Sequence, residues 1–325
     1  MRRREFIFAL GGAAVSPLTA LAQQQMPLVG FLNSASPDTY RFNADSFREG
    51  LGKAGFVEGR NVRIEERWAR GNYDLLPGLA AELVAMGVAA IAATGDVASA
   101  RAAQNARPKV PVVFTIGADP VRFGLVQSMN RPGGHVTGVS LLAYMLGAKR
   151  VELMREIAPR TSRIAMLMNP SNPNAMAEQT NAITGAQKLG IEIIVIHAGG
   201  PAEIDAAFER FQKDKIDAFI SGSDPILLDR REQIVALAAR QRIPAIYFAR
   251  QFVPIGGLLS YGPSISWMYR QAGEYIGQIL NGANPAEMPV MQPTQFEFVI
   301  NMKTARSLSL DVHPQLLARA NEVIE

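Results

Sequence analysis

The sequence predicts an α/β fold of two similar lobes. Short apolar runs alternate with segments of helical periodicity, which is typical of parallel sheets covered by helices. The layout of residues 29–38 recurs in residues 164–174, so that Asn33 falls on Asn169, 136 positions later. Any two βα units look alike, but three further segments match in the same order, which favours a repeated architecture. The length of 325 residues suffices for two domains, each with its own core.

The repeated stretch is a short apolar run followed by polar residues. The run 29–32 is expected to be a buried strand, and the polar residues should break it and start a helix. In an open α/β sheet such a loop lies at the carboxyl end of a strand, where ligands bind.

In the first half, the patterns predict strands and helices in alternation. Residues 62–68 alternate apolar and polar, as in a half-exposed strand. Asp74 and Asp96 stand where a side chain would cap the next helix. The expected strands are 29–32, 62–68, 88–93, 110–116 and 136–141, and the expected helices are 44–54, 75–86, 97–106 and 125–129.

The second half continues the alternation without a long linker, so we expect a compact pair of lobes joined by several crossings. The expected strands are 163–168, 191–196, 217–221, 244–248, 258–261 and 295–301, and the expected helices are 145–158, 174–189, 203–213, 227–241, 265–281, 303–308 and 314–324. The expected division is a first lobe of 26–140 plus 262–290, a second lobe of 141–258 plus 300–325, and crossings near 138–142, 258–262 and 295–301.

Residues 1–22 have the features of an export signal peptide. Three arginines at positions 2–4 precede an apolar core, residues 6–21, that is too short for a good membrane span. The segment Ala20-Leu-Ala22 fits cleavage after Ala22. The arginines resemble a twin-arginine signal, and a general-secretion signal is the alternative. We therefore expect a periplasmic protein.

Composition excludes several classes of function. Hydrophobic content of 48% and charged content of 19% indicate a globular chain. The net charge of +4 falls to +2 once residues 1–22 are removed, and no basic stripe is present, so nucleic acid is not an expected partner. The chain has no cysteine, which excludes disulfides, thiolate metal sites and a lipidated cysteine. We expect a freely diffusing monomer.

Motifs for catalysis, metals and cofactors are missing from the sequence. The three histidines, His135, His197 and His313, lack partners at metal-ligand spacing. There is no G-x-S-x-G elbow and no phosphate-binding loop. We expect no catalytic residue, no metal and no cofactor, although catalytic carboxylates need no motif.

Small polar residues at the expected strand ends, together with four aromatic residues, are the candidate ligand-binding residues. Helix N-termini there suit a carboxylate, and an aspartate could hold a ligand ammonium. Aromatic rings would enclose an apolar group. Together these groups suit a zwitterion with an apolar side chain. The candidates are Asn33, Ser34, Ser36, Tyr40, Trp68, Thr94, Gly95, Thr115, Asp119, Asn169, Asn172, Asp224, Tyr247 and Tyr261.

Each candidate also has an ordinary structural role available. Asn172 can be a simple helix cap. Tyr247 can be a core residue, and Trp68 can pack on a half-exposed strand. Their convergence on one edge of two lobes is what favours a ligand site.

The chain resembles periplasmic substrate-binding proteins of ABC transporters with the type I binding-protein fold, in the branch related to tryptophan- and tyrosine-binding components. The resemblance spans essentially the whole chain after the signal. It is carried by Val29-Gly-Phe-Leu-Asn-Ser-Ala-Ser-Pro-Asp38, Arg67-Trp-Ala69 with Leu76-Pro77, Thr115-Ile-Gly-Ala-Asp-Pro120, Asn130-Arg-Pro-Gly-Gly134, Arg230-Arg-Glu-Gln233 with Ile243-Pro-Ala-Ile-Tyr247, Ser260-Tyr-Gly-Pro263 and Gln292-Pro-Thr294.

The resemblance implies two Rossmann-like lobes joined by three crossing strands, which close on a small solute and dock to a membrane permease without catalysis. An aromatic or other apolar amino acid, or a related compound, is the expected solute. Asp96 departs from this expectation, because it stands where a small residue would better suit a ligand carboxylate.

Two other functions are weighed against a solute receptor. A secreted α/β hydrolase would use Asp224 or Asp119, and turnover of the bound compound would reveal it. A ligand-sensing regulator could have similar lobes, but the export signal and the lack of a helix-turn-helix segment before Val29 argue against it.

Overall fold

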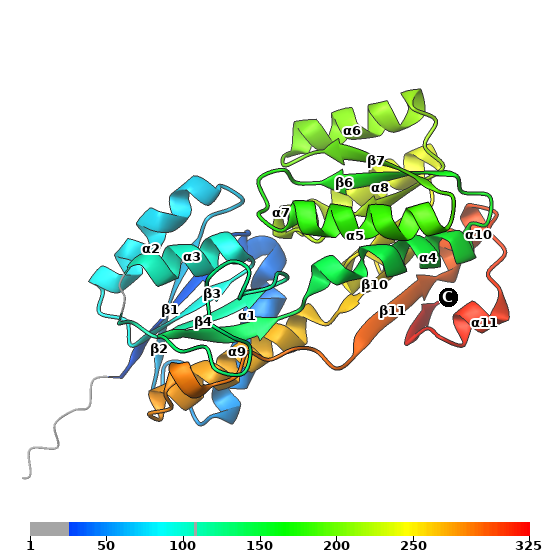
Figure 1. The fold of residues 1–325 in the computed structure, drawn as a ribbon. Helices are drawn as coiled ribbons and strands as arrows, with labels where there is room; N and C mark the ends of the chain where they lie inside the picture. The colour runs from blue at the N-terminus through cyan, green and yellow to red at the C-terminus, as the bar shows by residue number, and fades with distance from the viewer. Residues whose placement is uncertain (1–25, 107–108) are drawn as a thin grey trace, which may run out of the picture.

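The computed structural model describes residues 26–106 and 109–325, which form two lobes with one sheet each (Figure 1). The predicted export signal lies outside the described residues. The first sheet is parallel throughout and has the order β2-β1-β3-β4-β5. Its strands are β1 (Leu28–Asn33), β2 (Arg63–Trp68), β3 (Ala90–Thr94), β4 (Val112–Ile116) and β5 (Val136–Ser140).

The second sheet has the order β12-β11-β10-β9-β8-β6-β7. Only β10 and β11 pair antiparallel among its described strands. Its strands are β6 (Arg163–Met168), β7 (Glu192–His197), β8 (Ala218–Ser221), β9 (Ala245–Tyr247), β10 (Leu259–Pro263), β11 (Phe296–Asn301) and β12 (Glu322–Ile324).

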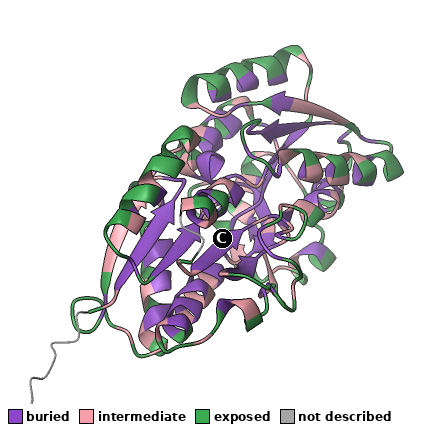
Figure 2. Cartoon of the chain, turned by 60° about the vertical axis from the view of Figure 1, so that its left-hand side comes forward, coloured by how far each residue is buried: buried purple, intermediate pink, exposed green. Residues whose placement is uncertain are grey.

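Helices cover both faces of each sheet, and Figure 2 shows buried strands inside exposed outer helix faces. The first lobe's sheet lies between α2 and α3 on one side and α9 and α1, which pack on each other, on the other side. The helices are α1 (Pro37–Lys53), α2 (Leu76–Ala85), α3 (Val97–Ala106), α4 (Gly147–Ile157), α5 (Ala175–Lys188), α6 (Pro201–Lys213), α7 (Pro225–Asp229), α8 (Arg231–Gln241), α9 (Ile265–Leu280), α10 (Met302–Ser307) and α11 (Pro314–Leu317).

The chain passes between the sheets three times: after β5, after β10 and before β11. The second passage returns α9 to the first lobe, where it packs closely on α1. Gly50 and Gly273 permit this approach, because a Cβ atom at either position would collide with the backbone of the facing helix. The contact fixes the N-terminal turn of α9 at the boundary between the lobes.

Several predicted elements differ in the structure. Helix α1 starts at Pro37 rather than at residue 44, because proline at the first turn pre-sets the helical φ angle. Residues 125–129 are not helical. The predicted cap Asp74 is wrong: it lies in a 3₁₀ turn whose cap is the Asn72 side chain, which accepts from the Asp74 N–H.

The C-terminal segment also differs from the prediction. Residues 314–324 form the short helix α11 and then β12, rather than one helix. The Asn321 side chain accepts from the Phe298 N–H, and β12 pairs parallel with β11. Pairing with a distant strand therefore overrides the local helical pattern. The predicted helix 227–241 is likewise divided at Arg230 into α7 and α8.

Candidate functional site

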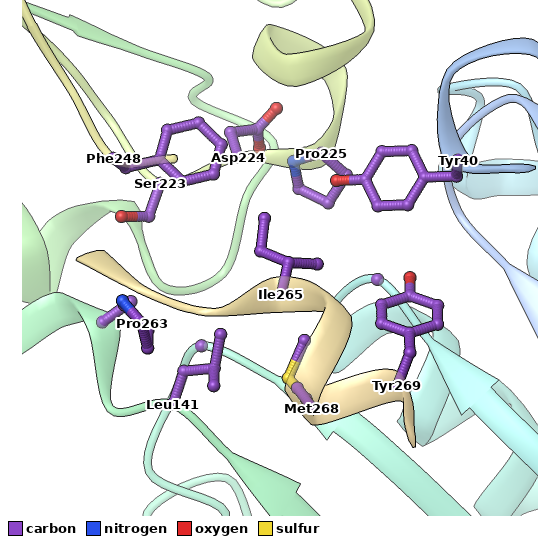
Figure 3. A pocket seen from close by; sticks show the side chains of 13 residues that line it. Tyr40, Leu141, Ser223, Asp224, Pro225, Phe248, Pro263, Ile265, Met268 and Tyr269 are labelled. Carbon is purple, nitrogen blue, oxygen red and sulfur yellow. The ribbon is translucent and has the colours of Figure 1, made fainter. Parts of the chain in front are cut away.

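A cavity of about 50 Å³ lies between the two lobes (Figure 3). It has room for only a few water molecules, so the lobes are close together in this structure. Its apolar wall comes from segments far apart in the chain, and in Figure 3 these side chains converge on one space. The apolar lining includes Leu141, Phe248, Pro263, Ile265 and Met268.

Four polar side chains complete the wall. Tyr40 comes from α1 and Tyr269 from α9, whereas Ser223 and Asp224 precede α7. The two phenol hydroxyls belong to the first lobe, and the carboxyl group belongs to the second (Figure 3). A mainly apolar pocket with a few placed polar groups is the usual form of a small-molecule site.

The first-lobe wall depends on the turn between β3 and α3. Gly95 lies there with φ at +105°, a conformation that favours glycine. A Cβ atom at this position would collide with the side chain of Ser34. The Gly95 N–H donates to Thr115 Oγ1 at 3.3 Å, which ties the turn to the end of β4.

Behind this wall, Asn33 orients the Tyr269 ring. The Asn33 amide donates to the Tyr269 hydroxyl at 2.9 Å and to Thr94 Oγ1 at 2.8 Å. Its oxygen accepts from the Ala35 N–H at 2.7 Å. Both polar atoms of the Asn33 side chain therefore form hydrogen bonds within the protein.

In the second lobe, Asp224 is held by four hydrogen bonds. One oxygen accepts from the N–H groups of Ile226 and Leu227 at 2.8 and 3.1 Å, so Asp224 caps α7. The other accepts from the amides of Asn169 and Asn172 at 3.1 and 2.8 Å. Burial raises the pKa of Asp224 to about 6, although the Asn172 amide and the Leu227 N–H act against this.

A buried ion pair supports the loop that carries Ser223. Arg150 on α4 and Glu178 on α5 are fully buried and meet at 2.5 Å. Glu178 also accepts from the N–H and the hydroxyl of Ser223, and Arg150 donates to the Tyr261 carbonyl at 2.9 Å. Burial lowers the pKa of Arg150, and Glu178 acts against this. The pair therefore links two helices, the cavity loop and β10.

Hydrogen bonds join the lobes directly beside the cavity. The Ser36 N–H, at the start of α1, donates to Asp229 Oδ2 at 3.0 Å, and the Thr39 hydroxyl donates to Asp229 Oδ1. On the other side, the Asn174 amide donates to the Gly117 carbonyl at 3.5 Å. Burial raises the pKa of Asp229 to about 6, while the Ser36 bonds act against this. This structure is therefore a closed arrangement of the lobes.

The structure places the predicted site residues in three groups. Tyr40, Gly95 and Asp224 line the cavity. A second group lies beside or behind the wall and is linked to it mainly by hydrogen bonds: Asn33, Ser34, Ser36, Thr94, Thr115, Asn169 and Asn172.

The third group lies away from the cavity. Trp68 packs on Phe31 and donates to Glu66. Tyr247 is stacked on Phe252 in the second lobe's core, and Tyr261 is stacked on Phe296. Asp119 accepts from the N–H groups of its own turn.

The sequence did not predict the cavity residues that come from α9 and from the passages between the lobes. Ile265, Met268 and Tyr269 line the cavity from one face of α9. Their i, i+3, i+4 spacing is that of any buried helix face, so it carries no signal for a ligand. Leu141 directly follows β5 and Pro263 ends β10, where the chain passes to the other lobe, and only the three-dimensional fold brings them to the cavity.

Two classes of site are not found in the described part of the chain. Residues 26–106 and 109–325 contain no group of three histidine or acidic side chains placed to hold a metal ion. Within the same ranges, no helix has the length and apolar character that a membrane crossing requires.

A family model of ABC transporter substrate-binding proteins matches residues 29–324. The chain belongs to this family. Family members are substrate-binding proteins rather than enzymes, which argues against the hydrolase. Membership implies a small-molecule ligand and a transporter permease as partner, and such proteins typically act outside the cytoplasm.

Two known proteins similar to this chain are described with an aromatic amino acid as their ligand. A tyrosine-binding protein of Clostridioides difficile is 26% identical over 264 residues, which are 81% of this chain and 75% of the relative. The solved structure of an ABC domain of Streptococcus pneumoniae in complex with L-Trp is 25% identical. The aligned region covers 92% of this chain and 99% of the chain in that structure, and the TM-score is 0.83.

A third comparison bears on the arrangement of the lobes. The ligand-free, open structure of a substrate-binding protein with adhesive properties from Clostridium difficile is 23% identical and has a TM-score of 0.65. The aligned region covers 92% of this chain and 99% of the chain in that structure. The TM-score is higher against the L-Trp complex than against this open structure. The predicted family and two-lobed type I fold are confirmed.

Proposed function

We propose that the protein is the periplasmic receptor of an ABC importer and that it binds one small solute between its lobes. The observation that carries this proposal is the cavity, because its wall takes residues from both lobes and direct hydrogen bonds close the lobes beside it. The solute is an aromatic or other apolar amino acid or a related compound, in keeping with the apolar wall and the relatives.

Hinge closure is the mechanism that this arrangement supports. A solute that touches Tyr40 and Tyr269 on one side and Asp224 on the other contacts both lobes only when they are closed. Its differential affinity then shifts the population towards the closed state, which the permease would recognise. In the same proposal, the export signal is cleaved after Ala22 and the mature protein is a monomer.

The test is a thermal-shift screen of the purified protein, followed by mass spectrometry of the recovered compound. The panel holds aromatic and branched amino acids, the amines and acids related to them, nucleosides, sugars and short peptides. A solute at 100 times its dissociation constant stabilises the protein by about 2.7 kcal/mol, which gives a clear shift of the melting temperature. A compound recovered unchanged supports the receptor, and a compound that is consumed supports the hydrolase.

A variant with a filled cavity gives the matched control. Ile265→Trp places a large ring into the lined space, so it should abolish the ligand-induced shift. Met176→Trp adds the same ring at a position that is 65% exposed and should leave the shift unchanged. Equal shifts in both variants would place the bound compound elsewhere.

A further inference from the structure

Carboxylates of the chain itself occupy the backbone donors on both sides of the cavity. Asp96, directly after the lining residue Gly95, accepts from the Ser99 N–H at 3.0 Å and caps α3. Asp224 accepts from two N–H groups at the start of α7. Free N–H groups at a helix start are what a ligand carboxylate would bind. A carboxylate would find these donors occupied and two carboxyl groups nearby.

Two buried aspartates have no partner of opposite charge: Asp224, which lines the cavity, and Asp96, which does not line it but directly follows the lining residue Gly95. Asp96 and Asp224 are 4% and 2% exposed, and neither forms an ion pair within residues 26–106 and 109–325. No lysine, arginine or histidine lines the cavity. The buried Arg150 does not balance them, because it is neutralised by Glu178. The net charge left at the site is therefore negative, which favours a cation over a zwitterion.

The two aspartates differ in what they leave free. Each oxygen of Asp224 accepts two hydrogen bonds, so its acceptor capacity is filled. Asp96 Oδ2 has no hydrogen-bond partner although it is buried. Burial raises the pKa of Asp96, and the Ser99 N–H, followed by the nearby hydroxyls of Tyr73 and Ser34, acts against this. Neither hydroxyl has a partner at hydrogen-bond geometry.

We propose that the solute is a cationic amine with an apolar body and without a free carboxylate, and that Asp96 binds its ammonium group. An ammonium has three N–H donors, and Asp96 Oδ2, Ser34 Oγ and the Tyr73 hydroxyl are three buried oxygens without a partner at hydrogen-bond geometry, each with a lone pair that can accept one. The apolar body would lie against Ile265 and Met268. This inference rests on the proposed function and narrows its solute to one class.

Matched pairs of ligands test the inference by calorimetry. The pairs are tyramine with tyrosine, tryptamine with tryptophan and phenethylamine with phenylalanine, and 4-ethylphenol is the neutral analogue of tyramine. We expect at least one amine to bind about tenfold or more tighter than its amino acid and its neutral analogue, as a charge-assisted bond in a buried site requires. Tighter binding of the amino acid than of its amine in every pair would overturn the inference.

The variant Asp96→Asn tests whether Asp96 is the residue that binds the ammonium group. Asparagine keeps the helix cap but removes the charge, so the preference for amine over neutral analogue should fall about tenfold. Asp311→Asn removes an exposed carboxylate of the second lobe and should leave the preference unchanged. Tyr73→Phe deletes one acceptor and should reduce the preference by a smaller factor, which keeps the test valid if Asp96→Asn does not fold.

The remaining outcomes separate this inference from the proposed function. An unchanged preference in both Asp96→Asn and Tyr73→Phe would show that the three oxygens serve the fold, for instance around a buried water. Binding of a sugar or nucleoside, with no binding of any amine, would overturn the amine class and keep the receptor. Absence of any binding across the whole panel would overturn both.

Discussion

Asn33 and Asn169 occupy matching places at the ends of β1 and β6, yet their amides meet different partners. Asn33 donates to the neutral hydroxyls of Thr94 and Tyr269, whereas Asn169 donates to the carboxylate of Asp224. In both loops the asparagine oxygen accepts from the N–H two residues later. The two lobes therefore repeat the backbone design of the loop and vary the side chains that complete it.

The two loops also differ in how fully their buried carboxyl groups are hydrogen-bonded. In the second lobe, Asp224 is satisfied by four donors, and a buried ion pair supports the loop beside it. In the first lobe, Asp96 Oδ2 and Ser34 Oγ lack partners. Unpaired buried polar atoms reduce stability and are common at functional sites. The Asp224 loop of the second lobe is thus the more fully bonded, rigid wall, whereas the Asp96 turn of the first lobe leaves two oxygens unpaired. Elsewhere in the second lobe, Arg150 Nη2 and Ser260 Oγ are also buried without a partner.

The largest expected effect tests the rigid wall. Glu178→Ala leaves the charge of Arg150 buried and unpaired and removes both bonds to Ser223. We expect a loss of about 3–5 kcal/mol in the free energy of unfolding, measured by urea denaturation. Glu152→Ala, which breaks a surface pair with Lys149, should cost less than about 1 kcal/mol. Similar losses in the two variants would contradict the role given to the buried pair.

The next effect compares the two caps. Asp224→Ala leaves the amides of Asn169 and Asn172 and two backbone donors without an acceptor. Its cost should be about 2–4 kcal/mol. Asp96→Ala removes the cap bond to Ser99 and also a buried carboxyl group that is only half satisfied, so its cost should be about 1 kcal/mol or less. If the two variants lose equal stability in urea, the lobes do not differ in the way described.

A smaller effect concerns the neutral network of the first lobe. Tyr269→Phe removes the acceptor of one Asn33 N–H inside the core. The expected loss is about 1–2 kcal/mol, seen as a lower melting temperature. Tyr275→Phe removes a hydroxyl that donates to the Pro289 carbonyl and is the matched control at about 1 kcal/mol. A neutral Tyr269→Phe variant would mean that the Asn33 amide finds another acceptor.

The smallest effect is a pH dependence of lobe closure through Asp229. Its pKa is about 6 in the closed contact, above the ordinary value of an exposed aspartate, so the closed state binds the proton more tightly. The free energy of lobe closure therefore becomes more favourable as the pH falls through 6 and less favourable above it, by about 1 kcal/mol or less. Arg230 and Arg231 lower this pKa, and Tyr40 also faces the carboxyl group.

Small-angle scattering of the ligand-free protein would measure that change. The radius of gyration should decrease between pH 7 and pH 5, and Asp229→Asn should remove most of the change. The pKa of Asp224 is also about 6. Its hydrogen bonds all lie within the second lobe, whereas those of Asp229 join the two lobes, so Asp224 should affect closure less. A pH response that persists in Asp229→Asn would assign it to another group.

Local patterns predicted most of the strands and helices. The buried strands β1, β3 and β6 are apolar runs ended by polar residues, and Asp96 caps α3 as its position indicated. These features depend on residues close in sequence, so periodicity and capping rules identify them. The repeat of the Asn33 loop at Asn169 also indicated the edge of each sheet that the cavity adjoins.

The contacts that build the site depend on residues far apart in the chain. Asn33 and Tyr269 are 236 positions apart, and Arg150 and Tyr261 are 111 apart. Neither pair has a local signal, because periodicity shows that a side chain is buried without showing what it meets. The sequence alone therefore determined the two-lobed α/β class and the polar strand ends, whereas the tertiary structure decided which of them face the cavity, since that follows from how α9 packs back against α1.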